Sequence, residues 1–545
     1  MKKNTSFSLS GNIVDVVCSR IFKGTLVVKN GKIVSVTEKN TPENHFILPG
    51  LIDAHVHIES SMLLPSEFAR LAVVHGTVGT VSDPHEIANV LGMKGIQFMI
   101  KNGKSTPFGF YFGAPSCVPA TPFETSGAKL GIKETETLLD NPEIKYLSEM
   151  MNFPGVLYDD TEVNGKLSAA KVREKVIDGH APGITGKDII KYAAAGVSTD
   201  HECFTLEEAR EKIQQGIKIL IREGSAAKNF DELLPLLAQY PQMVMFCSDD
   251  KHPDDLVKGH INQLVKRAID KGYNIIDCIR ACTLNPVRHY GLDSGLLQAG
   301  DNADCIIVDN LNDFTILSTF INGEKVAEGG RTLLSSVQNT PLNNFNAKEI
   351  TISDLQVVAK GKTIRVIKAL EGQLITDEIR CKAKIENGYV VSDTENDILK
   401  IVAINRYQPS APAIGFINNF KLQKGAFAST VAHDSHNIIA IGTSDKELLH
   451  AIKLIISSKG GICCVQDGEE AFLPLPFAGL MSTEDGYKVA ENYEKINEKL
   501  KAMGCQLNSP FMTLSFMALL VIPNLKISDK GLFDSKKFAF TSLFV

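Results

Sequence analysis

The stretch HFILPGLIDAHVHI, residues 45–58, decides the fold expected for this chain. It is the first of a series of short β-rich runs that alternate with helical patterns up to about residue 272. This alternation is typical of βα units around a parallel sheet. The other seven strands are expected at TVGTVSDP (77–84), FGFYFGAPSCV (108–118), IKYLSEM (144–150), VIDGHAP (176–182), VSTDHECF (197–204), KILIREGS (218–225) and MVMFCSDD (243–250). Eight parallel strands predict an α/β fold with a (β/α)8 TIM-type barrel over residues 46–297, rather than an open doubly wound sheet.

Short strands are also expected on both sides of the barrel. LVVKNGKIVSV, residues 26–36, contains an Asn-Gly step between apolar runs, which is a strong hairpin signal. Residues 298–335 again show short strands with glycine turns. We expect residues 1–45 and 298–335 to form one composite small β-sandwich. A polar linker at 336–348 then leads to an additional C-terminal α+β domain at 349–545.

Length and composition exclude several classes of protein. A chain of 545 residues with 44% hydrophobic and 22% charged residues is an ordinary globular protein of several domains. Its formal net charge of -6 offers no broad basic surface for nucleic acid. The longest apolar run, 516–522, is far shorter than the roughly 20 residues of a membrane span, and the N-terminus lacks a secretory signal. Eleven irregularly spaced cysteines suit a reducing compartment, so a cytoplasmic location is expected.

Polar residues lie at the ends of the predicted strands, where a barrel places its active site. His55 and His57 are two residues apart on the first strand, so both imidazoles face the same side and can bind one metal. The HxH pattern alone is weak evidence, and a carboxylate at a strand end often caps the next helix. The remaining strand-end residues are Glu149, His180, His201 and Asp249. Together, four histidines and two carboxylates favour one or two divalent ions.

Further polar residues near the strand ends have two interpretations each. Asp83, His85 and Glu86 in SDPHE could start a helix, or could contact a substrate or an auxiliary metal. Glu202 could hold a substrate nitrogen or cap a helix. The candidate substrate contacts are Glu86, Ser116, Arg222 and Ser225, for which loop, packing or solvent roles remain open. In VAHDSHN, the residues His433, Asp434 and His436 could bind a metal, although we favour a structural or lid role.

Several of these segments resemble the amidohydrolase superfamily and, more narrowly, its bacterial adenine deaminase family. The segments that carry the resemblance include DAHVHIESSM (53–62), DPHEIANV (83–90), DGHAPG (178–183), STDHE (198–202) and CSDD (247–250). GAFASTVAHDSHN (425–437) and LPLPFAGLMS (473–482) resemble the extra domain of the same family. The resemblance covers nearly the whole chain. It implies the hydrolytic conversion of adenine to hypoxanthine and ammonia, as in purine salvage and adenine catabolism.

The resemblance also implies an arrangement of two metal ions. His55, His57 and Asp249 would hold one ion, His180 and His201 the other, and Glu149 would bridge them. Manganese or iron(II) is favoured, and zinc also suits these donors. Such an ion lowers the pKa of bound water from about 15.7 toward roughly 7. Asp249 is expected to accept the proton of that water, with Glu202 as a second catalytic candidate.

Two alternatives to this function remain open. Another cyclic-amide or amidine hydrolase of the superfamily would share the barrel and its ligands. Many such relatives with two metals use a carboxylated lysine at the end of strand four, whereas here Lys145 lies at its beginning and Glu149 at its end. A noncatalytic barrel scaffold would be expected to lack the ligands. We expect adenine as the small-molecule partner and a homo-oligomer as the assembly.

Overall fold

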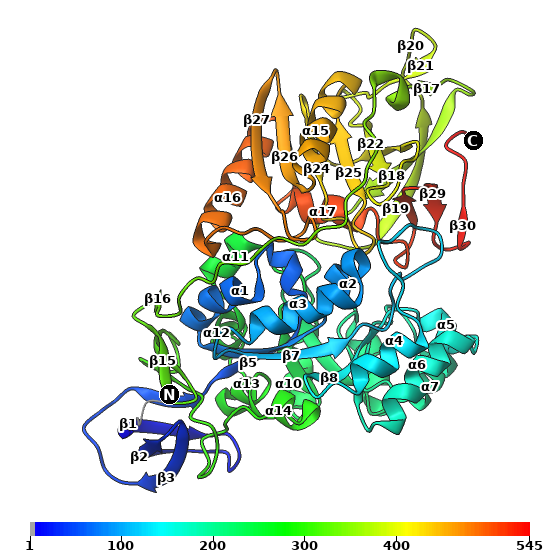
Figure 1. The fold of residues 1–545 in the computed structure, drawn as a ribbon. Helices are drawn as coiled ribbons and strands as arrows, with labels where there is room; N and C mark the ends of the chain where they lie inside the picture. Colours follow the sequence, from blue (N-terminus) through cyan, green and yellow to red (C-terminus); the bar gives the residue numbers. More distant parts are fainter. Residues whose placement is uncertain (1–5) are drawn as a thin grey trace.

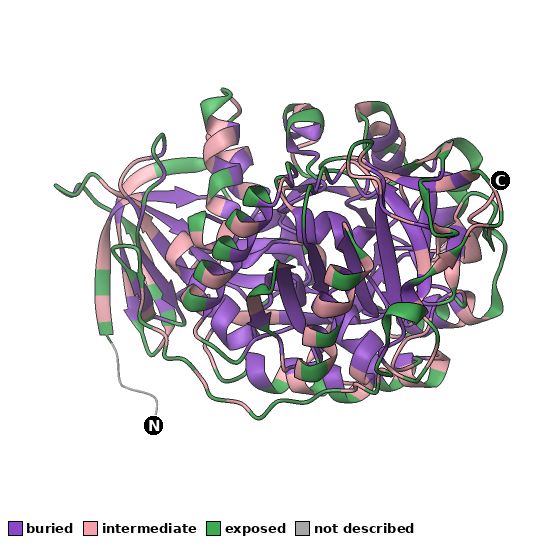
Figure 2. Cartoon of the chain, turned by 90° about the horizontal axis from the view of Figure 1, so that it is seen from above, coloured by how far each residue is buried: buried purple, intermediate pink, exposed green. Residues whose placement is uncertain are grey.

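The computed structural model describes residues 6–545. Figure 1 shows the barrel in the middle of the molecule, with the C-terminal part of the chain above it and a sheet from both flanks below it. Figure 2 shows buried residues running through all of these layers. The barrel mouth therefore faces the C-terminal domain.

Eight parallel strands form the barrel, one at each predicted segment. They are β5 (Leu51–Val56), β6 (Thr77–Ser82), β7 (Gly109–Ala114), β8 (Ile144–Met150), β9 (Val176–Gly179), β10 (Thr199–Asp200), β11 (Lys218–Arg222) and β12 (Val244–Cys247). Strands β5–β9 and β10–β12 are hydrogen-bonded in chain order. The Ser198 amide donates to the Ile177 carbonyl at 2.9 Å, and the Asp249 amide donates to the His55 carbonyl at 2.9 Å. These two bonds join the sheets at both edges, so the ring closes as predicted.

Helices follow the barrel strands, and the last four of them lie after the final strand. They are α1 (Pro65–Ala72), α2 (His85–Leu91), α3 (Met93–Gly103), α4 (Ile132–Leu139), α5 (Phe153–Leu157), α6 (Thr161–Val172), α7 (Gly186–Ala194), α8 (Leu206–Gln214), α9 (Phe230–Leu233), α10 (Pro235–Gln239), α11 (Pro253–Lys258), α12 (Ile261–Asp270), α13 (Ile275–Arg280) and α14 (Leu284–Tyr290). Helix α12 buries Ile261, Leu264, Val265 and Ala268, the spacing of one helical face. Helices α2 and α3 are divided at Gly92, whose φ of 58° suits glycine.

Strands from the two flanks pair directly in one eight-stranded sheet. Its order is β16 (Arg331–Thr332), β15 (Glu324–Glu328), β14 (Ile316–Ile321), β13 (Cys305–Val308), β4 (Phe46–Pro49), β1 (Ser6–Asp15), β2 (Arg20–Lys29) and β3 (Lys32–Glu38). Strand β13 pairs antiparallel with β4, and β1 pairs parallel with β4. The expected composite arrangement of the two flanks is therefore confirmed.

The first predicted barrel strand needs a correction. Residues 46–49, which we expected to begin that strand, form β4 in the flanking sheet, and the barrel begins at Leu51. Gly50 separates the two strands and lies so close to β6 that a Cβ there would overlap both methyl groups of Val78. A continuous apolar run hides this change of sheet, because β4 and β5 are both buried.

The C-terminal domain has its own eight-stranded sheet, as expected for an α+β unit. The strand order is β19 (Thr376–Lys382), β18 (Thr363–Ala369), β23 (Ala413–Asn418), β22 (Leu399–Ile404), β25 (Ile438–Gly442), β24 (Ala426–Ser429), β26 (Gly461–Gln466) and β27 (Glu469–Pro474). Its longer helices are α15 (Asp445–Ser458) and α16 (Gly486–Ala502), and α17 (Pro510–Phe516) lies next to the barrel in Figure 1. Arg70 of α1 pairs with Asp485 at 2.7 Å, which joins the two domains.

All eleven cysteines are unpaired in residues 6–545, and most are buried. The nine buried ones pack as small apolar side chains. Over the same range, no helix has the length and apolar character that crossing a bilayer requires.

The close approach at Gly50 yields a stability prediction. Gly50→Ala places a methyl group against Val78 of β6, and overpacking of this kind costs about 1–3 kcal/mol. We expect a lower midpoint of thermal unfolding. Gly361→Ala is the control, because the nearest atom to its added Cβ, Cδ1 of Phe544, is 3.3 Å away. Equal midpoints for the two variants would contradict the close packing of β4–β5 on β6.

Candidate functional site

The structure brings all six predicted metal ligands together at the barrel mouth. His55 lies in β5 and His57 directly follows that strand. Glu149 lies near the end of β8, His180 and His201 follow β9 and β10, and Asp249 lies two residues beyond β12. Each side chain belongs to a residue that is at most 5% exposed. Parallel strands all end at one rim of the barrel, so residues from five strands converge.

The Glu149 carboxylate lies between the histidines. Its Oε1 is 3.2 Å from His57 Nε2, and its Oε2 is 2.7 Å from His180 Nδ1 and 3.3 Å from His201 Nε2. On the far side of His57, Asp249 Oδ1 is 3.2 Å from the same Nε2. This places Glu149 between the two predicted groups of ligands, in the position expected of a bridge.

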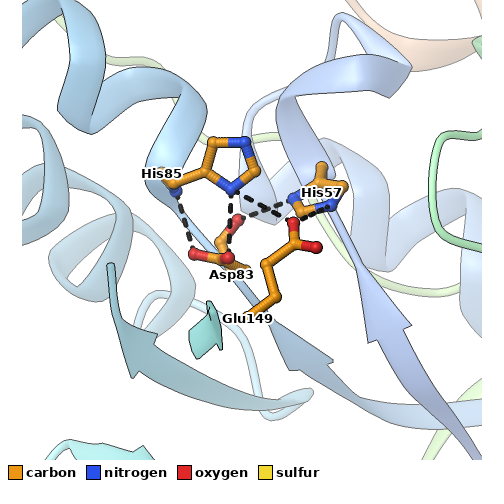
Figure 3. Close-up of side chains that lie close together, drawn as sticks. All are labelled: His57, Asp83, His85 and Glu149. Carbon is orange, nitrogen blue, oxygen red and sulfur yellow. Dashed lines mark hydrogen bonds and ion pairs between the residues drawn. The ribbon is translucent and has the colours of Figure 1, made fainter. Parts of the chain in front are cut away.

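The tautomer of His57 indicates whether these residues can bind a cation. His57 Nδ1 is 3.2 Å from the backbone carbonyl of Asp83 (Figure 3), so Nδ1 carries the proton and Nε2 presents a lone pair. That lone pair faces His55 Nε2 at 3.2 Å and the oxygens of Glu149 and Asp249. Burial would raise the pKa of Glu149, but the surrounding histidines hold it well below its usual value. A carbonyl that fixes a histidine tautomer is the usual support of a metal ligand, and the donor set fits a divalent cation.

His85 is a residue of the site that the sequence interpretation left undecided. Its Nδ1 lies 3.0 Å from Asp83 Oδ2 and 3.6 Å from Glu149 Oε1, as Figure 3 shows. The Asp83 side chain also accepts the amide proton of His85 at the start of α2. SDPHE therefore both begins a helix and contributes to the mouth.

A buried arginine connects two of the carboxylates. Arg222 donates through Nη1 to Asp249 Oδ2 at 2.6 Å and through Nη2 to Glu202 Oε2 at 3.1 Å. Burial alone would raise the pKa of Asp249, but the Arg222 guanidinium and the nearby imidazoles hold it well below its usual value. Asp249 is therefore ionised.

The four candidate substrate contacts already have partners within the protein. Glu86 accepts from two histidines, and Arg222 is bound to Glu202 and Asp249. Ser116 donates to the Glu149 carbonyl at 2.5 Å, and Ser225 donates to Asp255 at 2.6 Å. The sequence does not reveal partners brought in by other loops and by a second domain. The role of these four residues as substrate contacts stays a prediction, and Glu86 is the one of them that lines the cavity.

The C-terminal domain covers the mouth. Its contribution to the cavity wall consists of Leu374, His433, Asp434, Phe516 and Leu519. The cavity has a volume of about 20 Å³, little more than one water molecule needs. A ligand larger than a few atoms can enter only when these covering segments move.

One contact between the domains explains the VAHDSHN motif. Glu86 of α2 accepts hydrogen bonds from His433 Nδ1 and His436 Nε2, across as many as 350 residues of sequence. The Ala432 amide donates to His436 Nδ1 at 3.2 Å, so Nε2 carries the proton and cannot bind a metal. Burial would raise the pKa of Glu86, but His433 and His436 hold it well below its usual value. The motif thus joins the barrel by hydrogen bonds to the C-terminal segments that cover the mouth, which we call the lid. This agrees with the structural or lid role that we favoured.

Comparison with known proteins gives matches over both large domains. Residues 46–326 match the model of the amidohydrolase family, and residues 373–539 match that of the adenine deaminase C-terminal domain. The chain is 54% identical to a protein from Methanosarcina mazei named adenine deaminase, over 98% of this chain and 99% of that protein. Proteins of the same name from Salinibacter ruber and Borreliella burgdorferi are 51% and 47% identical, and at least 98% of each chain is covered.

The Glu86 contact yields a second prediction. Glu86→Gln leaves one acceptor oxygen and turns an NH2 group toward an imidazole N–H, and an unsatisfied buried group costs about 1–3 kcal/mol. We expect a lower unfolding midpoint and faster proteolysis in the coil around residues 336–348. Glu162→Gln is the control, since Glu162 is only partly buried, pairs with Lys129 and Lys166, and does not contact the C-terminal domain. Parental proteolysis of Glu86→Gln would show that this contact does not hold the domains together.

Proposed function

The chain belongs to the adenine deaminase family of amidohydrolases, and we propose that it hydrolyses adenine to hypoxanthine and ammonia with the six converging side chains at the barrel mouth. The convergence of four histidines on the Glu149 and Asp249 carboxylates is the observation that supports this use. The comparisons favour this activity over another cyclic-amide hydrolase and over a noncatalytic scaffold.

The buried cluster suits a divalent cation, and we propose that it holds two. His55, His57 and Asp249 are the proposed ligands of one ion, His180 and His201 those of the other, and Glu149 the bridge. A bound cation supplies a Lewis acid that lowers the pKa of coordinated water toward about 7. Nitrogen and oxygen donors without thiolate favour manganese or iron(II) in our proposal, with zinc also suited to them.

Asp249 is the proposed proton carrier. Its Oδ1 faces the histidines, while its Oδ2 is held by Arg222, so the carboxylate has a fixed direction. An ionised Asp249 can accept a proton from the attacking water at Oδ1. The carboxylate would then pass that proton to the purine or to the departing amine. Glu202 lines the cavity and is bound to Arg222, and we retain it as the candidate to hold a ring nitrogen.

The lid has a proposed part in catalysis through water exclusion. A cavity of about 20 Å³ cannot admit a purine while the lid segments stay in place. We propose that adenine enters when the C-terminal segments move, and that these segments then close over the bound base less tightly than in this structure while still removing bulk water. Closure of this kind positions a flat base and strengthens the electrostatic interactions around it.

Location and assembly remain proposals. Unpaired, mostly buried cysteines support a cytoplasmic location, and the small-molecule partner is adenine. A homo-oligomer stays a prediction, for which sedimentation analysis is the direct measurement.

Asp249→Asn tests the proton carrier. An amide keeps the shape of the side chain but cannot accept the proton, and general acid–base catalysis contributes typically about 10²- to 10⁴-fold. We expect a loss of kcat of that size in ammonia release from adenine, with metal content verified by elemental analysis. Near-parental turnover in a metal-loaded variant would remove Asp249 from this role.

Glu149→Gln tests the bridge. A neutral amide is a poor link between two cations, so we expect fewer metal ions per chain and faster loss to a chelator, while the circular dichroism spectrum stays unchanged. Metal content is measured on the purified parent and variant. Two ions per chain in both, retained equally during chelation, would refute the assignment.

A further inference from the structure

Asp434 is a buried carboxylate of the C-terminal domain, with one oxygen beside His85 and the other without a donor among the described residues. It is 3% exposed and lies in the wall of the cavity. Within residues 6–545, its Oδ2 has no hydrogen-bond partner. The imidazole nearest to its other oxygen, Oδ1, is that of His85, whose Nε2 is 3.5 Å away and also lies 3.4 Å from Glu86 Oε1.

The other carboxylates in the cavity wall differ from Asp434 in this respect. Glu202 and Asp249 accept from Arg222, Glu86 accepts from two histidines, and Glu149 lies 2.7 Å from His180 Nδ1. Asp250 accepts from Ser60 at 2.5 Å. A buried carboxylate oxygen without a donor is costly. Among the carboxylates that line the cavity, Asp434 is therefore the one with an oxygen available to accept a hydrogen bond from a ligand.

His85 fixes the place of Asp434 relative to the reacting centre. The His85 Nδ1 edge lies 3.6 Å from Glu149, and its Nε2 edge lies 3.5 Å from Asp434. The two carboxylates are thus separated by the width of one imidazole ring plus a contact on each side. A purine also has two distant polar edges, with the amino-bearing carbon on the six-membered ring and an N–H on the five-membered ring.

We propose that Asp434 accepts a hydrogen bond from the N–H of the five-membered ring of adenine. The amino-bearing carbon then points toward Glu149 and the histidines, as the proposed reaction, on which this inference rests, requires. A nucleoside carries a sugar in place of that N–H. The lid thereby selects the free base in two ways, because a nucleoside leaves Asp434 without a donor and brings a bulky group to the closed side of the cavity.

The test compares adenine with 9-methyladenine, which keeps the amino group but has no N–H on the five-membered ring. The parent enzyme, Asp434→Asn and Asp434→Ala are assayed for ammonia release in metal-loaded form. For both variants we expect kcat/KM for adenine to fall by about 10- to 100-fold, the effect of losing a hydrogen bond to a charged group. The kcat/KM for 9-methyladenine should stay within about threefold of the parent value. The ratio of kcat/KM for adenine to kcat/KM for 9-methyladenine should therefore fall in both variants.

Asp529→Asn is the matched control. Asp529 is a buried carboxylate of the same domain that accepts from the Thr125 amide at 2.9 Å and from Asn405 at 3.0 Å, and it does not line the cavity. The ratio of kcat/KM for adenine to kcat/KM for 9-methyladenine should be the same in this variant as in the parent, even if the variant is less stable. Binding of hypoxanthine and 9-methylhypoxanthine, measured by calorimetry, provides a readout that does not depend on turnover.

The possible results of this experiment distinguish the proposed role of Asp434 from the proposed deamination of adenine. Equal losses for both substrates would mean that Asp434 contacts the amino group or only supports the lid, and would overturn the proposal. An unchanged kcat/KM for adenine in both Asp434→Asn and Asp434→Ala would overturn the proposal as well. A metal-loaded parent that releases no ammonia from adenine would instead refute the proposed function itself.

Discussion

The arrangement of side chains at the barrel mouth depends on keeping the Glu149 carboxylate ionised among histidines in a place that excludes water. Burying such a charge is costly unless positive charge and hydrogen bonds surround it. The barrel meets this requirement by ending five of its strands at one rim, so that His57, His180 and His201 reach the same carboxylate. With Nδ1 of His57 protonated, a cation among these donors would satisfy the Nε2 lone pair together with the oxygens of Glu149 and Asp249.

The C-terminal domain completes this environment. The barrel alone would leave the carboxylates open to water, where interactions between charges are weak. Leu374, Phe516 and Leu519 bring apolar surface over the mouth, while His433 and His436 bind Glu86. The ring of His433 also stacks on Phe516, with centroids 5.5 Å apart. The same segment thus closes the cavity and fixes its own position on the barrel.

Much of the fold could be predicted because its signals are local. Strand β8 coincides with the predicted IKYLSEM, and strand-end residues such as His180 and His201 follow from barrel geometry. The boundary at Gly50 was missed because β4 and β5 are apolar on both sides of it. The partners of Glu86 and Arg222 were missed for a different reason. These contacts depend on how distant segments pack, and no local pattern marks a carboxylate that will meet an imidazole more than 340 residues away.

The cavity wall runs from His57, near the beginning of the chain, to Leu519, near its end. When the whole barrel has been synthesised, the cavity therefore still lacks part of its wall. The growing chain carries the six proposed metal ligands for much of its synthesis with the mouth uncovered, and the cavity closes only when α17 and the segment after it have been made and have folded. The proposed ligands are thus open to solvent ions before the cover is in place.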